Sequence, residues 1–129
     1  MKPSLEKVPG DFVILRFPVG TAPPESAWQS FFCSVSQSSD ELSVVCEARY
    51  SPAGAHKAEK GWAVFRVSGE LDFSLTGLLA SIANPLAQNQ VGLLAISTFD
   101  TDYILVKSEK MNAAKSVLQK AGFSWADEL

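Results

Sequence analysis

The two halves of this chain repeat one short pattern, and the repeat limits the folds open to it. The segment FFCSVSQSSDELSVV, residues 31–45, aligns without gaps with GLLAISTFDTDYILV, residues 92–106. Each copy has an apolar run, a polar turn and a second apolar run, which is the pattern of a β-hairpin. Upstream, VILRF at residues 13–17 resembles AVFRV at residues 63–67. Each half therefore predicts one strand followed by a hairpin.

The first hairpin also predicts its own register. With the turn centred between Ser39 and Asp40, most apolar side chains of both strands fall on one surface. The cross-strand pairs are then Cys33 with Cys46, Val35 with Val44 and Gln37 with Leu42. Two cysteines are too few for a disulfide framework or a four-thiolate zinc site. No base or helix N-terminus is evident beside either thiol, so we expect reduced, buried thiols.

Two helices are predicted in the second half, which reads β-α-β-β-α. The apolar residues on one face of the first helix are Leu75, Leu78, Leu79, Ile82 and Leu86. We expect this helix to begin near Phe73 and to end or kink around Asn84, because Pro85 cannot continue the hydrogen-bond ladder. A second amphipathic helix is predicted over residues 109–121, with Gly122 as its stop.

The first half has no room for a long helix. Only ten or so residues join its strand to its hairpin, and Pro18, Pro23 and Pro24 lie among them. The segment SPAGAHKAEK, residues 51–60, interrupts the patterns of both halves. We therefore predict two units, residues 1–58 and 59–129. Since a unit of about 60 residues is marginal alone, we expect the two to share sheet or core contacts.

The composition excludes several classes of partner. With 129 residues, of which 47% are hydrophobic and 19% charged, the chain falls in the range of a globular domain. A formal net charge of -3 offers no basic surface for a nucleic acid. No segment approaches the roughly 20 apolar residues that cross a bilayer. We expect a soluble, cytoplasmic protein.

The start of the predicted first helix is a candidate anion site. The first turn of a helix has unsatisfied N–H groups and a partial positive charge, so the loop over residues 70–74 can receive a ligand carboxylate. Gly77 inside this helix would cost about 1 kcal/mol relative to alanine. Two explanations stay open for it: a ligand packs directly on the backbone, or a stripe of small side chains packs closely against the sheet.

Two aspartates follow the apolar strand of the second hairpin. A carboxylate of Asp100 or Asp102 can hold an ammonium group through a charge-assisted hydrogen bond, or it can serve only in the turn. Metal binding by the pair is not expected, because no further oxygen ligands lie at calcium-loop spacing.

The chain resembles the ACT-type ligand-binding domains. The resemblance is carried by residues 69–106 and more weakly by residues 31–45. It is to the tandem form found in small bacterial proteins and in the eukaryotic cytosolic arginine sensors. The resemblance implies an α+β fold of two ferredoxin-like βαββαβ units, the first abbreviated. It also implies a small ligand, usually an amino acid, held where the units pair, by the loop before the first helix and the turn after the next strand. The matching positions are Asp72, Phe73, Gly77, Leu78, Thr98, Phe99 and Asp102. An acidic residue of the sensors is matched here by Leu75, which argues against arginine as the ligand.

Catalysis is the weaker interpretation. His56 is the only histidine and lies in the interrupting segment. No nucleophile stands beside a base, and the glycines do not have phosphate-loop spacing. We therefore predict a sensor or regulatory module without catalytic activity, metal or cofactor, forming a homodimer. The alternatives are a ligand-free module for protein interaction and, least favoured, an enzyme that uses Cys33 or Asp102.

Overall fold

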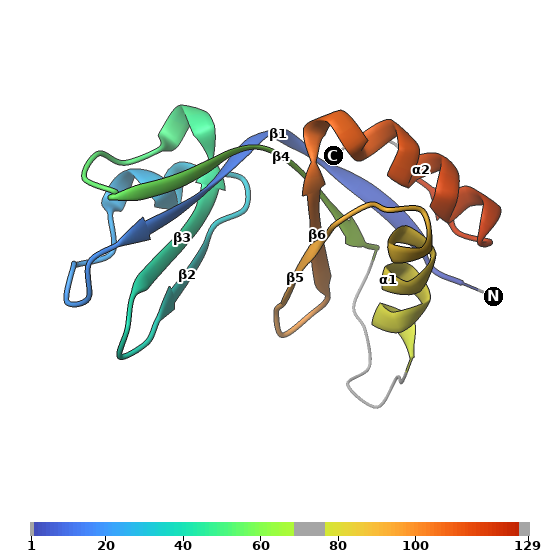
Figure 1. The fold of residues 1–129 in the computed structure, drawn as a ribbon, viewed down its shortest axis with the longest axis horizontal. Helices are drawn as coiled ribbons and strands as arrows, with labels where there is room; N and C mark the ends of the chain where they lie inside the picture. Colours follow the sequence, from blue (N-terminus) through green and yellow to red (C-terminus); the bar gives the residue numbers. More distant parts are fainter. Residues whose placement is uncertain (1, 69–76, 127–129) are drawn as a thin grey trace. The chain divides into compact units, whose positions relative to one another are not determined.

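The computed structural model describes residues 2–68 and 77–126 (Figure 1). The chain divides into two compact units. We call Pro9–Trp62 the continuous unit, and Met1–Val8 with Ala63–Leu129 the split unit. Two strands, β1 (Ser4–Phe17) and β4 (Lys57–Val67), contribute residues to both units. Residues 2–8 thus pack with the second half, and the predicted boundary between residues 58 and 59 stays a prediction.

The continuous unit is an antiparallel sheet with short connections. Its strand order is β2 (Ser34–Gln37), β3 (Leu42–Glu47), β1 and β4. The connections hold only two 3-10 turns, η1 (Glu25–Gln29) and η2 (Ala48–Tyr50). The prediction that no long helix lies here is therefore confirmed. In the hairpin, Val35 pairs with Val44 and Gln37 with Leu42, which confirms the predicted register.

The core of the continuous unit comes from alternate residues of two paired strands. Because side chains alternate across a strand, every second residue of β1 and β3 points to one face. The buried members of this cluster are Val13, Leu15, Phe17, Ala27, Leu42, Val44 and Cys46. Ala27 comes from η1, which therefore covers this face of the sheet.

The split unit combines a sheet with two helices. Along the chain, β4 is followed by α1 (Leu78–Gln88), β5 (Leu94–Ser97), β6 (Asp102–Lys107), a 3-10 turn η3 (Ser108–Lys110), α2 (Met111–Lys120) and β7 (Ser124–Trp125). The strand order is β7, β1, β4, β6 and β5, with β7 parallel to β1. This β-α-β-β-α-β succession is typical of a ferredoxin-like fold.

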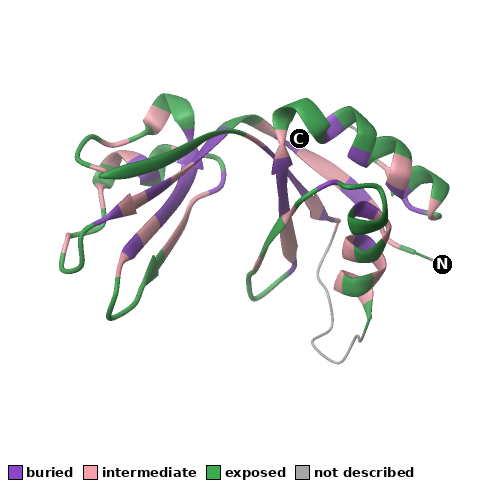
Figure 2. Ribbon diagram, viewed as in Figure 1, coloured by how far each residue is buried: buried purple, intermediate pink, exposed green. Residues whose placement is uncertain are grey.

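Both helices of the split unit bury their apolar faces against the sheet (Figure 2). Ile82 and Leu86 of α1 and Leu118 of α2 are fully buried. The sheet supplies Phe65 of β4 and Leu5 of β1 to the same core. The N-terminal end of β1 is therefore part of this core, although the sequence pattern did not predict a strand before Val13.

The first helix begins later than predicted and does not end around Asn84, while a kink there stays a prediction. It begins at Leu78, because Gly77 has φ 79° and ψ -5°, a left-handed conformation outside the helix. It also continues through Pro85 to Gln88. A proline removes one helical hydrogen bond, and the last turn is held by the N–H groups of Asn89 and Val91, which donate to the carbonyl of Leu86 at 3.1 and 2.9 Å.

The second helix and its end agree with the sequence. Helix α2 spans Met111–Lys120 and is preceded by η3, within the predicted residues 109–121. Gly122 follows with φ 104°, which confirms it as the stop.

Strand β4 begins at Lys57, inside the segment predicted to interrupt both patterns. Residues 57–61 are exposed. In the continuous unit β4 is an edge strand, and edge strands carry charged side chains without losing their hydrogen bonds on the inner side. Because the charged residues of this segment interrupt the apolar pattern, the sequence did not predict this part of the strand.

The two hairpins are related by a shift of 60 residues, so the ungapped alignment with a shift of 61 is wrong by one residue. Val35 pairs with Val44, and Ala95 pairs with Ile104. The turns agree with this shift: the N–H of Ser38 donates to the carbonyl of Glu41 at 3.0 Å, and that of Thr98 to Thr101 at 2.8 Å. A shift of one residue exchanges the two faces of a strand, so similarity of apolar content alone does not fix the phase.

Candidate functional site

The start of α1 carries two of the predicted site residues. Gly77 is exposed, and a Cβ added to it would meet no atom within 4 Å. Its left-handed backbone explains the glycine, so close packing against the sheet is not needed. Leu78, the first helical residue, is half-buried against the core. Among the described residues no side chain caps this helix end. Asp72 and Phe73 lie outside the described residues.

The turn after β5 carries the other three. The N–H and Oγ1 of Thr98 both donate to the carbonyl of Thr101, at 2.8 and 3.1 Å. Asp102 is half-buried, and its Oδ1 accepts a bond from Oγ of Ser97 at 2.5 Å. Phe99 is 78% exposed. The turn is therefore ordered by its own hydrogen bonds, with one oxygen of Asp102 already engaged.

These two groups lie toward the same end of the split unit (Figure 1). There the N-terminal end of α1 and the tip of the β5–β6 hairpin point in one direction. The oxygen Oδ2 of Asp102 is not part of the bond to Ser97. The arrangement can thus present helix N–H groups for a carboxylate and an aspartate oxygen for an ammonium group.

A second polar site, which the sequence analysis missed, is built around Glu47 at the end of β3. Glu47 is only 3% exposed. Its Oε2 accepts a hydrogen bond from the N–H of Phe31 at 2.6 Å, and its Oε1 accepts one from Nε of Arg49 at 3.2 Å. Its own N–H donates to Oγ of Ser30 at 2.8 Å. A buried carboxylate is costly unless it is paired in this way.

Gly10 of β1 makes room for this carboxylate. It has φ 103°, and a Cβ there would lie 2.8 Å from Oε1 of Glu47. A glutamate that ends the apolar run LSVVC, with Arg49 two residues later, was the available sequence signal. It was not decisive, because nothing in the sequence links Gly10 to Glu47.

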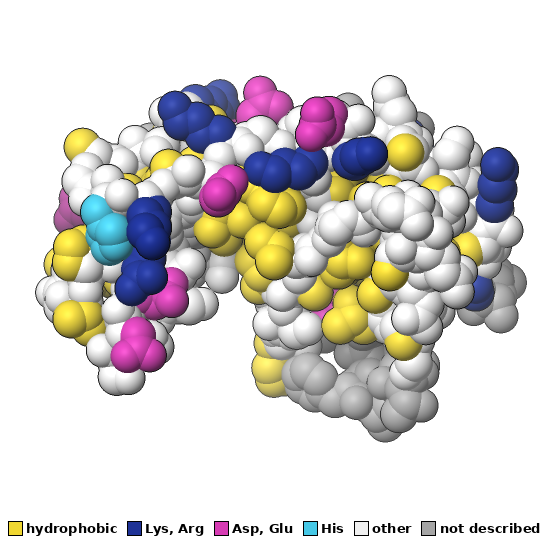
Figure 3. Space-filling model, viewed as in Figure 1, with side chains coloured by type: hydrophobic (Ala, Val, Ile, Leu, Met, Phe, Trp, Pro, Cys, Tyr) yellow, Lys and Arg dark blue, Asp and Glu magenta, His cyan; other side chains and the backbone are white. Residues whose placement is uncertain are grey.

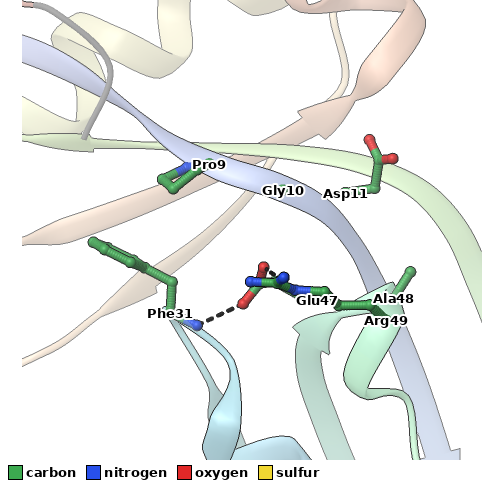
Figure 4. Close-up of a pocket in the computed structure, with 7 residues that line it drawn as sticks. All are labelled: Pro9, Gly10, Asp11, Phe31, Glu47, Ala48 and Arg49. Carbon is green, nitrogen blue, oxygen red and sulfur yellow. Dashed lines mark hydrogen bonds and ion pairs between the residues drawn. The ribbon is translucent and has the colours of Figure 1, made fainter.

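A pocket of about 460 Å³ opens beside Glu47 (Figure 4). The lining residues are Pro9, Gly10, Asp11, Phe31, Glu47, Ala48 and Arg49, all of the continuous unit. This volume lies within the range of small-molecule sites, about 300–1,000 Å³. The pocket brings the Glu47 carboxylate and the Arg49 guanidinium together beside Phe31, whereas the Asp11 carboxylate points away from them.

The two cysteines are free thiols, with Cys46 buried and Cys33 half-buried. Burial raises the pKa of both. That of Cys46 reaches about 11, with smaller contributions from Cys33 and Glu47. The thiolate is the reactive form of cysteine, so a nucleophilic cysteine needs a lowered pKa. Neither Cys33 nor Cys46 has one.

Within residues 2–68 and 77–126, no group of three or more His, Cys, Asp or Glu side chains could hold a metal ion. No helix in this part of the chain is long and apolar enough to span a membrane. Basic and acidic side chains are interspersed on the face shown in Figure 3. The predictions of no metal and no nucleic acid stay predictions.

Comparison with known proteins identifies the family. The profile of the ACT domain matches residues 57–120, from the start of β4 to the end of α2. The crystal structure of protein Atu0741 from Agobacterium tumefaciens has a TM-score of 0.91 and 32% identity, over 100% of this chain and 96% of that one. The ligand-free regulatory subunit of aspartate kinase from Thermus thermophilus, at 10% identity and a TM-score of 0.62 over 88% of this chain and 93% of that one, shares the fold alone.

Similarity to an amino-acid sensor covers part of the chain. The human "Cytosolic arginine sensor for mTORC1 subunit 1" is 37% identical over 60 residues, which is 46% of this chain and 18% of the sensor. The mouse protein is 34% identical over 68 residues, 52% of this chain and 20% of the sensor. The match thus spans about a fifth of these relatives. Because the profile of the ACT domain matches residues 57–120, this part of the chain belongs to the ACT-domain family.

Proposed function

We propose that the chain is a regulatory module that binds an amino acid, without catalytic activity, in the cytoplasm. ACT domains are regulatory ligand-binding modules, and the match to the arginine sensors points to amino acids as the class of ligand. The observation that carries the proposal is that one matched segment, residues 57–120, contains both the start of α1 and the Thr98–Asp102 turn.

The proposed site residues are Gly77, Leu78, Thr98, Phe99 and Asp102, together with Asp72 and Phe73. N–H groups of the first turn of α1 receive the carboxylate of the ligand, where the helix dipole favours negative charge. The half-buried carboxylate of Asp102 receives the ammonium group. Opposite charges of a zwitterion are then met at its two ends.

Calorimetry against the twenty amino acids tests this site. Loss of one charge-assisted hydrogen bond costs about 1.5 to 3 kcal/mol, so Asp102→Ala should weaken binding roughly 10 to 150-fold. Asp100→Ala is the matched control, because it removes an exposed carboxylate from the same turn. Circular dichroism checks the fold of both variants. Equal binding by wild type and Asp102→Ala would remove Asp102 from the site.

The second candidate is a ligand-free module for self-association. It is favoured by β5, an edge strand of the split unit on which Leu94 is 44% exposed, and by Phe99 at 78%. Exposed edges and apolar side chains are often covered by a second copy. Light scattering should show a homodimer under both candidates. If no amino acid binds the wild-type protein at millimolar concentration while a dimer forms, this second function replaces the first.

A further inference from the structure

We propose that the pocket beside Glu47 binds a small organic cation, an ammonium or guanidinium ion on a short apolar group, in the place that the Arg49 guanidinium now occupies. This pocket belongs to the continuous unit. The proposed amino-acid site is formed by residues of the split unit. The inference therefore does not depend on the proposed function.

The Glu47 carboxylate is already oriented for a cation. Its backbone N–H donates to Ser30, and its Oε2 accepts from the N–H of Phe31 at 2.6 Å, so the side chain is fixed at both ends. Its Oε1 is directed to the guanidinium of Arg49 at 3.2 Å. A carboxylate has about four acceptor positions, and these two bonds use only two of them. A cation that enters the pocket meets a carboxylate whose desolvation has already been compensated within the fold.

Arg49 is a partner that a ligand can replace. Its side chain is 71% exposed, whereas that of Glu47 is 4% exposed. Because the guanidinium reaches the surface, it can move into solvent when another cation pairs with the buried carboxylate. The guanidinium also lies over the ring of Tyr50, with Cζ 4.7 Å from the ring centroid. A ligand that takes the place of this guanidinium must therefore also compensate for the loss of this cation–π contact.

The other lining residues suit an organic cation. The single guanidinium of the pocket is already paired with Glu47, and the carboxylate of Asp11 points away from this pair (Figure 4). The ring of Phe31 is half-exposed and can contact either the charge or the apolar group of the ligand. Gly10 leaves space next to Oε1 that any side chain would fill. Figure 4 shows the Glu47 carboxylate and Arg49 together, with Phe31, Pro9 and Gly10 around them.

Titration of the full chain with n-butylammonium and n-butylguanidinium tests the proposal. We expect saturable binding by calorimetry, with NMR shifts of the backbone amides of Phe31 and Glu47. Glu47→Gln keeps the shape but removes the charge and should weaken binding about 10-fold or more. Arg49→Met removes the competing cation and should strengthen binding roughly 2 to 5-fold. Asp40→Asn, an exposed acidic residue of the same unit, is the control for net charge.

The two variants are expected to change the affinity in opposite directions, so either one alone can contradict the proposal. If Glu47→Gln does not fold, Arg49→Met still must bind more tightly, and weaker binding by it overturns the proposal. Absence of saturable binding to the wild-type chain also overturns it. So does equal or tighter binding of n-butyrate, which would make Arg49 the binding group of an anion site. An effect of Asp40→Asn as large as that of Glu47→Gln would reduce the result to general charge attraction.

Discussion

At the scale of single residues, the best-defined feature is the pairing of a glycine with a buried carboxylate. Gly10 is needed for two separate reasons, its φ of 103° and the 2.8 Å that would separate a Cβ from Oε1 of Glu47. Gly20 offers a comparison, since it has φ 85° and no atom within 4 Å of a Cβ. A side chain at Gly20 would therefore cause backbone strain alone, whereas a side chain at Gly10 would cause backbone strain and a steric contact.

We therefore predict that Gly10→Ala destabilises the protein more than Gly20→Ala. An alanine with positive φ costs about 1 kcal/mol or more at either position. At Gly10 the contact with Glu47 should add about 1 to 3 kcal/mol, as overpacking does. Urea unfolding measures both free energies. Equal losses in the two variants would mean that Glu47 moves aside without cost.

The raised pKa of Cys46 predicts a dependence of stability on pH. Burial raises this pKa from its ordinary value of 9.0 to about 11. As pH rises past the ordinary value, the unfolded chain loses this proton first, so the contribution of Cys46 is full below it and lost progressively toward the folded value. Thermal unfolding between about pH 7 and 10.5 should show a steeper loss for wild type than for Cys46→Ala. Parallel curves would contradict this.

At the scale of elements, α1 is the helix whose sequence and structure disagree most. Pro85 lies within it, although a proline in a helix interior costs about 3 kcal/mol relative to alanine. Pro85→Ala restores a donor toward the carbonyl of Ser81. Part of this gain is offset because alanine gives the unfolded chain more freedom.

We predict that Pro85→Ala raises the free energy of unfolding by about 1 kcal/mol or more. Ala87→Gly, at an exposed position of the same helix, should lower it by about 1 kcal/mol and serves as the calibrating variant. Midpoints of urea unfolding give both values. A neutral or destabilising Pro85→Ala would show that the ring packs in a way alanine cannot reproduce.

Elements with one clear period were predictable from the sequence, and elements with mixed signals were not. The first hairpin was predicted to the residue because alternation and a polar turn agreed on one register. Strand β1 before Val13 was missed because Pro9 and Gly10 interrupt its pattern. Of the predicted site, the described residues fall at a helix start and a turn. Glu47 was missed because its partners, Phe31 and Gly10, are distant in sequence and no local pattern marks them.

At the scale of the whole molecule, strands β1 and β4 each contribute one segment to each of the two units. Residues 2–8 of β1 belong with residues 63–126, while residues 57–62 of β4 complete the sheet of the continuous unit. Residues 2–8 are well packed there, since Leu5 and Val8 are both fully buried. A mutation near the N-terminus should therefore affect helices that lie far away in sequence.

We predict that Leu5→Ala costs about 2 to 5 kcal/mol, as deletion of a buried leucine does. Hydrogen exchange should show lost protection in β6 and α2, whose residues share its core. Leu42→Ala, in the core of the continuous unit, is the matched variant and should instead expose β2 and β3 first. If Leu5→Ala and Leu42→Ala give one pattern of exchange, the two units unfold as one.

The division of β1 between the two units also affects the order in which segments are buried during synthesis. Residues 9–62 form a continuous stretch, so the sheet of that unit can close as soon as they have left the ribosome. Leu5 leaves earlier, but the other members of its core, from Ala63 to Phe123, follow later. Leu5 is therefore translated long before the residues that bury it, and until they follow its side chain is open to chaperones and proteases.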